Sequence, residues 1–200
     1  MSGFRDMSLV DFGEALASDA ATPGGGSASA LAGALAASLV GMVARMTEGM
    51  EGVAAEADAA REELLALVDE DARAFDRVMA AFRLPKGTDE EKAARTEAIQ
   101  RGYEAATEPP ARVCARALRV LELAAEVAER GNPNAVSDAG VAALLAESAL
   151  VGAALNVRIN VASIKDAGFR REHEDAASAA VTGARELREK ALAQVRATLG

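Results

Sequence analysis

The sequence predicts an all-α protein, a bundle of about six to seven long antiparallel helices that form a single domain over residues 1–200. Half of the 200 residues are hydrophobic but only 3% are aromatic. The core is therefore expected to consist of Ala, Leu and Val, whose small side chains let helices approach closely. No segment alternates apolar and polar residues for long, as a half-buried β-strand would.

Composition excludes several classes of function. The net charge of −9 and the pI near 4.8 argue against a nucleic-acid surface, which needs clustered Lys and Arg. The single cysteine, Cys114, excludes an internal disulfide, and with the single histidine, His173, a zinc site would need several carboxylates. No metal is expected. The N-terminus lacks the apolar core of a signal peptide, so a cytoplasmic location is expected.

Residues 28–44 contain no charge, and eleven of the seventeen are Ala, Gly or Ser. A membrane-spanning helix needs about twenty strongly apolar residues, so this stretch is expected to be a buried helix rather than a membrane segment. Small residues recur on it every four positions, at Ser29, Gly33, Ala37 and Gly41. Such a seam admits a second helix at short range, either within the chain or from a second copy.

Caps and breakers predict where the helices begin and end. Ser8 is expected to cap a first helix, Ser27 the second, and Ser137 the sixth, while Thr88 and Glu91 form a capping box for the fourth. Pro109 and Pro110 are expected to interrupt the chain between a fourth and a fifth helix. The expected helices are 9–17, 27–47, 53–82, 88–107, 111–130, 138–164 and 170–199.

One carboxylate interrupts an apolar stripe. Leu64, Val68, Asp71, Phe75, Val78 and Phe82 follow steps of three and four along the third helix. A carboxylate on such a face must be paired, hydrogen-bonded or protonated, because burial of a lone charge is costly. Asp71 is either a structural partner of an Arg or Asn, or a group held for function. Its neighbours Asp69 and Glu70 are expected to be solvated.

Several other polar residues allow two interpretations, one structural and one functional. Asp138 either complements the helix dipole or lines a site together with Asn132, Asn134 and Ser137. Asn156 and Asn160 lie one turn apart among apolar residues and serve either hydrogen bonds between helices or contact with a ligand. His173 is expected to be an exposed bystander, and Cys114 to serve packing.

Six segments occur in an order that resembles a known family. They read P-G-G-G-S at 23–27, M-V-A-R-M-T at 42–47, D-A-R-A-F at 71–75, V-M-A-A-F-R-L-P-K at 78–86, G-N-P-N-A-V-S-D-A-G at 131–140 and L-N-V-R-I-N at 155–160. This pattern resembles the cyclodeaminase/cyclohydrolase family of folate enzymes, over about residues 8–168. The family includes the cyclodeaminase half of formiminotransferase-cyclodeaminase and stand-alone methenyltetrahydrofolate cyclohydrolases.

The resemblance implies a homodimer or higher oligomer, a tetrahydrofolate derivative as ligand, and no metal or organic cofactor beyond that folate. It makes Asp138 and Asp71 the candidate catalytic residues, with Asp138 preferred because its loop gives access to substrate. The candidate substrate-binding residues are Gly24, Gly25, Gly26, Ser27, Lys86, Asn134, Ser137, Asn156 and Asn160. Lys86 is expected to meet the anionic glutamate tail.

The preferred function is a cyclohydrolase, a hydrolase that opens 5,10-methenyltetrahydrofolate to 10-formyltetrahydrofolate. The absence of a formiminotransferase domain and the segment 89–100 favour this activity. The alternative is a cyclodeaminase, a lyase that releases ammonia from 5-formiminotetrahydrofolate to give the methenyl compound. Both reactions pass through a tetrahedral carbon and need proton transfer, for which carboxylates suffice. A non-catalytic folate-binding module is a more distant alternative.

Overall fold

The computed structural model describes residues 3–200, which contain six α-helices, two short 3-10 helices and no β-strand. These elements are, in chain order, η1 (Phe4–Asp6), α1 (Leu9–Ala17), α2 (Gly25–Arg45), α3 (Glu51–Phe82), α4 (Asp89–Arg130), η2 (Pro133–Ala135), α5 (Val136–Val161) and α6 (Ala167–Leu199). The prediction of an all-α helical bundle is confirmed.

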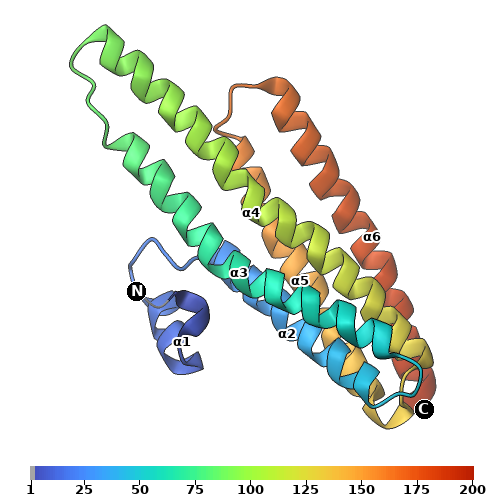
Figure 1. Cartoon of the computed structure of the whole chain (residues 1–200). Helices are drawn as coiled ribbons and strands as arrows, with labels where there is room; N and C mark the ends of the chain where they lie inside the picture. The colour runs from blue at the N-terminus through green and yellow to red at the C-terminus, as the bar shows by residue number, and fades with distance from the viewer. Residues whose placement is uncertain (1–2) are drawn as a thin grey trace.

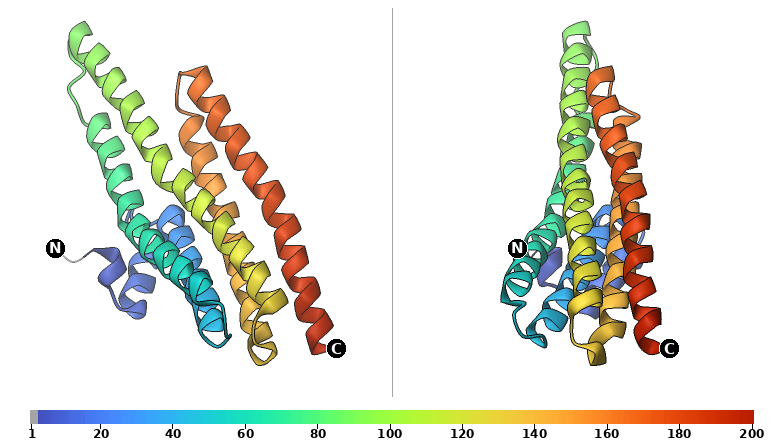
Figure 2. Two further views of the ribbon diagram at one scale, coloured as in Figure 1. Left: turned by 45° about the vertical axis from the view of Figure 1, so that its right-hand side comes forward. Right: turned by 90° about the vertical axis from the view of Figure 1, so that its right-hand side faces the viewer.

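The five long helices form two layers. α3, α4 and α6 make up one layer, and in the other α2 packs against α3 and α4 while α5 packs against α4 and α6. In Figure 1, α2 and α5 lie behind α3 and α4, and α1 lies to one side of the bundle. The α3–α4 hairpin projects at one end of the molecule, as both views in Figure 2 show. The layer of α2 and α5 is covered on one face only.

Several predicted helix ends are confirmed. α1 spans Leu9–Ala17, and the Ser8 hydroxyl accepts the Asp11 backbone N–H at 3.1 Å. Thr88 and Glu91 form the predicted capping box at the start of α4. α3 ends at Phe82 and α4 at Arg130, as the Pro85-Lys86-Gly87 loop and Gly131 indicate.

Two predicted serine caps are wrong. α2 begins at Gly25 with Gly24 as its N-cap, because the extended Gly24 backbone lets its carbonyl accept the Ala28 N–H at 3.0 Å. Ser27 therefore lies inside the first turn, where it is fully buried. α5 begins at Val136 after the η2 turn, so Ser137 also lies inside the helix instead of capping it.

The predicted break at Pro109 and Pro110 is also wrong, because α4 continues through both for 42 residues. A proline lacks the N–H that would bond to the carbonyl four residues earlier. For Pro110 that carbonyl belongs to Ala106, and the Asn160 side-chain amide donates to it at 2.7 Å. A side chain from α5 thus replaces the missing helix bond.

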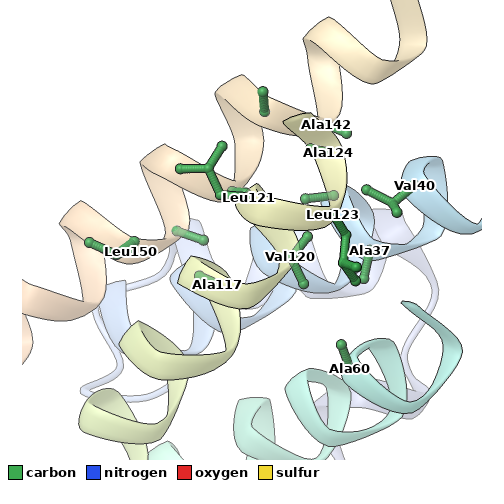
Figure 3. Packing of buried hydrophobic residues seen from close by; sticks show 14 of the residues in the cluster. Ala37, Val40, Ala60, Ala117, Val120, Leu121, Leu123, Ala124, Ala142 and Leu150 are labelled. Carbon is green, nitrogen blue, oxygen red and sulfur yellow. The ribbon is translucent and has the colours of Figure 1, made fainter. Parts of the chain in front are cut away.

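The small-residue seam of α2 packs within the chain. Ser29, Gly33, Ala37 and Gly41 are all buried. A Cβ added at Gly33 would lie 3.2 Å from the Leu64 methyl carbons on α3 and 3.5 Å from the Ala149 Cβ on α5. Figure 3 shows the Ala, Val and Leu side chains that fill the space between α2, α4 and α5. Small residues thus let α2 reach both neighbouring helices.

Two helices within residues 3–200 are long and apolar enough to cross a membrane, at Gly25–Arg45 and Pro133–Val161. In this fold, 61% and 50% of their most apolar windows are buried inside the protein. Both belong to the layer formed by α2 and α5.

Candidate functional site

A cavity of about 320 Å³ opens where the N-terminus of α2 meets α3, α4 and the C-terminal end of α5. This volume lies within the range of small-molecule sites. The cavity is lined by Ala21, Thr22, Gly24, Gly25, Gly26, Asp71, Phe75, Tyr103, Ala106, Asn156, Ile159, Asn160 and Ser163. Six of the predicted site residues therefore lie together here, and Ser27 contacts one of them.

Asp71 is the only ionisable carboxylate on this lining. The Ser27 hydroxyl lies 3.1 Å from Asp71 Oδ2 and 3.0 Å from the Val68 carbonyl oxygen. Burial raises the pKa of the Asp71 carboxyl above its usual value, and hydrogen bonds from the Ser27 side chain and backbone oppose that rise. When Asp71 is protonated, its O–H can donate to Ser27, whose hydroxyl then donates to Val68. The pair can therefore hold a proton without leaving a polar group unsatisfied.

The glycines bring the α2 backbone against this carboxylate. A Cβ added at Gly26 would overlap the Asp71 carboxyl oxygens, so no larger residue fits there without displacing Asp71. At Gly25 an added Cβ would lie 3.6 Å from Asn156 Nδ2, which is an ordinary contact. The first turn of α2 has no side-chain cap, and its Ser27 backbone N–H bonds Asp71, so the N–H groups of Gly25 and Gly26 are the ones available to a ligand in the cavity.

The two asparagines present their carbonyl oxygens. Asn156 Nδ2 donates to the Gly152 carbonyl at 2.9 Å and Asn160 Nδ2 donates to Ala106. Asn160 thus makes the predicted hydrogen bond between helices, whereas the bond of Asn156 stays within α5. Each Oδ1 is left to accept a hydrogen bond from a ligand with N–H groups.

Two aromatic residues of the lining were missed as site residues by the sequence analysis. Phe75 was assigned to the core stripe, but it is 39% exposed and lines the cavity one turn after Asp71. Tyr103 packs edge-on against Phe82 with ring centroids 6.2 Å apart. The spacing of four between Asp71 and Phe75 was a usable signal, whereas nothing in the sequence links Tyr103 of α4 to this end of the bundle.

A second group of predicted site residues lies at the opposite end of α5. Asn134, Ser137 and Asp138 follow Asn132, which donates its backbone N–H to Thr47 Oγ1 near the C-terminal end of α2. The eighteen residues from Asp138 to Asn156 span about 27 Å of helix. Within one chain, Asp138 and Asp71 are not brought together, and a substrate-binding role for this group stays a prediction.

Lys86 also lies apart from the cavity. It is exposed in the loop at the tip of the α3–α4 hairpin. Eleven helical residues separate Asp71 from Phe82, about 16 Å, before this loop begins. A contact between Lys86 and the distal end of a long ligand stays a prediction.

Asp69 and His173 differ from their predicted exposed positions. Asp69 is buried, with 8% of its surface exposed, and its Oδ1 accepts the Phe4 backbone N–H at 2.6 Å. Glu70 forms an ion pair with Arg112 at 2.7 Å. The His173 side chain is only 15% exposed and stacks on Phe169 at 4.0 Å. Cys114 is buried as predicted, and burial raises the pKa of its thiol to about 12.

Known proteins resemble this chain over most of its length. Residues 8–179 match the family described as formiminotransferase-cyclodeaminase. A methenyltetrahydrofolate cyclohydrolase of Methylorubrum extorquens is 43% identical over 174 residues, which cover 82% of this chain and 84% of that protein. A formimidoyltransferase-cyclodeaminase of Gallus gallus is 36% identical over 186 residues, or 86% of this chain.

The fold has a close counterpart in a crystal structure. The formiminotetrahydrofolate cyclodeaminase of Thermotoga maritima matches with a TM-score of 0.87 and 25% identity, over 98% of both chains. By contrast, the chain spans only 34% of the Gallus gallus protein. From the match over residues 8–179 and the 43% identity to a relative of similar length, the chain belongs to the formiminotransferase-cyclodeaminase family.

Proposed function

We propose that this protein is a methenyltetrahydrofolate cyclohydrolase, which adds water to the 5,10-methenyl cation and opens it to 10-formyltetrahydrofolate. The match to the Methylorubrum extorquens cyclohydrolase, along 84% of that protein, is the observation that carries the proposal. The cavity supports it, because a raised-pKa carboxylate, two amide carbonyls and two aromatic rings converge there.

The residues of the cavity suit the parts of this substrate. Phe75 and Tyr103 offer faces on which the flat pterin can pack. The Oδ1 atoms of Asn156 and Asn160 can accept hydrogen bonds from pterin N–H groups. The absence of a side chain at Gly26 leaves space beside Asp71 for the one-carbon bridge, close to its carboxylate.

Asp71 then carries the proton through the reaction. Water attacks the methenyl carbon, a C–O bond forms, and the proton of the water passes to the Asp71 carboxylate. The tetrahedral intermediate collapses as the C–N5 bond breaks, and N5 takes the electron pair together with the proton from Asp71. The hydroxyl oxygen then forms the C=O bond of the formyl group and releases its remaining proton to solvent, so the overall reaction yields one proton. A carboxyl whose pKa is raised toward the working pH is suited to both transfers. The reaction consumes water and the folate, and we propose that it uses no further cofactor.

Absorbance of the methenyl chromophore tests the proposal. The wild-type protein is expected to remove the chromophore faster than buffer alone, and Asp71→Asn is expected to abolish the difference while it retains the helical circular dichroism spectrum. Asp76→Asn is the matched control, because Asp76 lies on the same helix, is exposed and does not line the cavity. Equal turnover by Asp71→Asn and the wild type would show that Asp71 does not transfer the proton.

The second candidate is a formiminotetrahydrofolate cyclodeaminase. The Thermotoga maritima protein of that activity shares the fold at a TM-score of 0.87. The same Asp71 would then protonate the departing ammonia instead of transferring a proton from water to N5. If the protein forms the methenyl chromophore from 5-formiminotetrahydrofolate but does not consume added methenyltetrahydrofolate, the cyclodeaminase is favoured. Folate binding without either reaction would favour a non-catalytic module.

We also propose that the protein is a homodimer, formed through the open face of the α2–α5 layer. We call this surface the α2–α5 face. It exposes Leu35 and Met42 of α2, Met46 directly after α2, and Val141, Leu144, Leu155 and Ile159 of α5, which are 38% to 70% exposed. The only charged residue among positions 139–157 is Glu147, which pairs with Arg188 of α6.

The energetics of this face favour a partner. Full burial of one aliphatic side chain is worth about 1.5–3 kcal/mol, so covering seven half-exposed ones yields on the order of 5–10 kcal/mol before the cost of association. Apolar patches of this kind on soluble proteins usually mark an interaction site.

A further inference from the structure

The α2–α5 face joins the two separated groups of predicted site residues. Asn156 and Asn160 border the cavity at one end of α5, and Ser137 and Asp138 lie at the other end. The apolar side chains of α5 fill the interval between them, from Val141 to Ile159. A molecule that covers the α2–α5 face therefore contacts both groups of predicted site residues.

The four exposed large apolar residues of α5 are arranged nearly symmetrically about position 150. Val141 and Ile159 stand nine residues before and after it, and Leu144 and Leu155 stand six before and five after. An antiparallel second copy of α5, related by a two-fold axis at this level, would place Val141 against Ile159 and Leu144 against Leu155. A two-fold interface requires this kind of self-complementarity.

Charge favours the antiparallel arrangement. The first turn of α5 carries Asp138 and its last turn carries Arg158. Arg158 points to α6, where it donates to Ser178, so the helix dipoles decide the orientation. Antiparallel copies place opposite dipole ends of α5 beside each other, whereas copies with parallel α5 helices would place like ends together. The rest of the face carries no charge that association would bury unpaired.

In this register Asp138 of one copy reaches the cavity of the other. Position 138 comes level with Ala162, within one turn of Asn160 and Ser163 on the cavity lining. Asp138 and Asn156 are eighteen residues apart, which is five helical turns, so both lie along the same edge of α5. We place the two-fold axis in the plane of the face and perpendicular to α5. With this axis, the α5 edge that carries Asp138 and Asn156 lies beside α2 in both copies and on the same side of the interface.

We propose that each active site is shared between two copies of this chain, with Asp71 from one protomer and the partner's Asp138 on opposite sides of the substrate. This inference rests on the proposed folate function. The partner's Asp138 supplies a second carboxylate, which offsets the positive charge of the methenyl group while Asp71 transfers the proton. A single chain holds only one of the two carboxylates at the cavity.

Subunit complementation tests the shared site. Asp71→Asn and Asp138→Asn are each expected to be inactive as homodimers. In a heterodimer of the two variants, purified with two different tags, one site has both native carboxylates and the other has neither. The heterodimer is therefore expected to recover about half of the wild-type turnover per dimer. A heterodimer as inactive as its parents, or an active Asp138→Asn homodimer, would overturn the proposal.

Cross-linking tests the arrangement independently of activity. In a Cys114→Ala background, Ser137→Cys and Ala162→Cys in the same chain are about 37 Å apart, but adjacent across the proposed interface. A short bis-maleimide is expected to link the double variant into dimers. Either single variant serves as a control, because its two copies would be about 36–39 Å apart.

The two experiments separate the possible failures. A wild-type protein inactive on both folates would refute the proposed function, while the cross-links would still show whether Asp138 reaches the partner's cavity. Absence of the cross-link in the double variant, links in the Ser137→Cys control, or a monomer that floats with phosphatidylcholine vesicles would each overturn the shared site.

Discussion

Among the three glycines of the cavity, Gly26 is the one at which an added side chain has the least space. A Cβ at this position would overlap the Asp71 carboxyl oxygens. Gly26→Ala is expected to displace Asp71 and to lower turnover on the order of 10²-fold, because small misplacements of a reacting group have effects of that size. Steady-state kinetics and circular dichroism would measure the two consequences.

Gly52→Ala is the control for this substitution. Gly52 is exposed on α3 outside the cavity lining, and an added Cβ there has no neighbour within 4 Å. Turnover within a few-fold of wild type is expected for Gly52→Ala. If Gly26→Ala turned over substrate as fast as this control, the three glycines would serve only to turn the chain.

Ser27 governs the pH dependence of Asp71. Its hydrogen bonds lower the Asp71 pKa against the larger effect of burial. Ser27→Ala is therefore expected to raise that pKa further. Because Asp71 must be ionised to accept a proton from water, the acidic limb of the kcat/KM profile is expected to move to higher pH.

A pH-rate profile of Ser38→Ala provides the comparison. Ser38 lies on the same helix, but its hydroxyl donates to the Ala34 carbonyl and does not line the cavity. Its acidic limb is expected to coincide with that of the wild type. A shift of the Ser27→Ala limb toward lower pH would contradict the assignment of Asp71 as the proton acceptor.

At the scale of elements, the continuity of α4 depends on α5. The Ala106 carbonyl, which Pro110 cannot satisfy within α4, accepts a hydrogen bond from Asn160. Asn160→Leu is expected to cost about 1–3 kcal/mol of unfolding free energy, the cost of an unsatisfied buried carbonyl. Chemical denaturation would measure this loss.

A double-mutant cycle isolates that contribution. Pro110→Ala restores an N–H that can bond to Ala106 within the helix. Asn160→Leu is therefore expected to cost at least about 1 kcal/mol less in the Pro110→Ala background. Equal costs in both backgrounds would show that Asn160 stabilises the protein by other contacts.

At the scale of the whole molecule, the α2–α5 face is expected to determine both oligomeric state and activity. Leu144 is 45% exposed on this face and lies twelve residues, about 18 Å, from Asn156. Leu144→Glu is expected to yield monomers in light scattering. Turnover is expected to be lost as well, because each cavity then lacks its partner.

Leu199→Glu is the control, since Leu199 is 66% exposed at the end of α6, outside the face. It is expected to remain dimeric and active. Leu144→Glu dimers that retain full turnover would show that copies associate elsewhere.

Local patterns determined most helix ends. The Ser8 cap, the Thr88–Glu91 box and the stops at Phe82 and Arg130 depend on neighbouring residues, and the structure agrees with each. The failures have a different origin. The Pro109–Pro110 step depends on Asn160 of α5, which no local rule contains. Ser27 fails as a cap because Gly24 starts the helix three residues earlier, and its hydroxyl donates to the Val68 carbonyl of α3 instead.

The sequence by itself determined the helical class, and it identified Asp71, the glycines and the asparagines, because buried polar residues stand out from an apolar period. Only the tertiary structure decided which of these share a cavity. It adds Phe75 and Tyr103, and it separates Asp138 from Asp71 by the length of α5. Side-chain chemistry can be read from residue order, whereas distances between helices depend on how their faces pack.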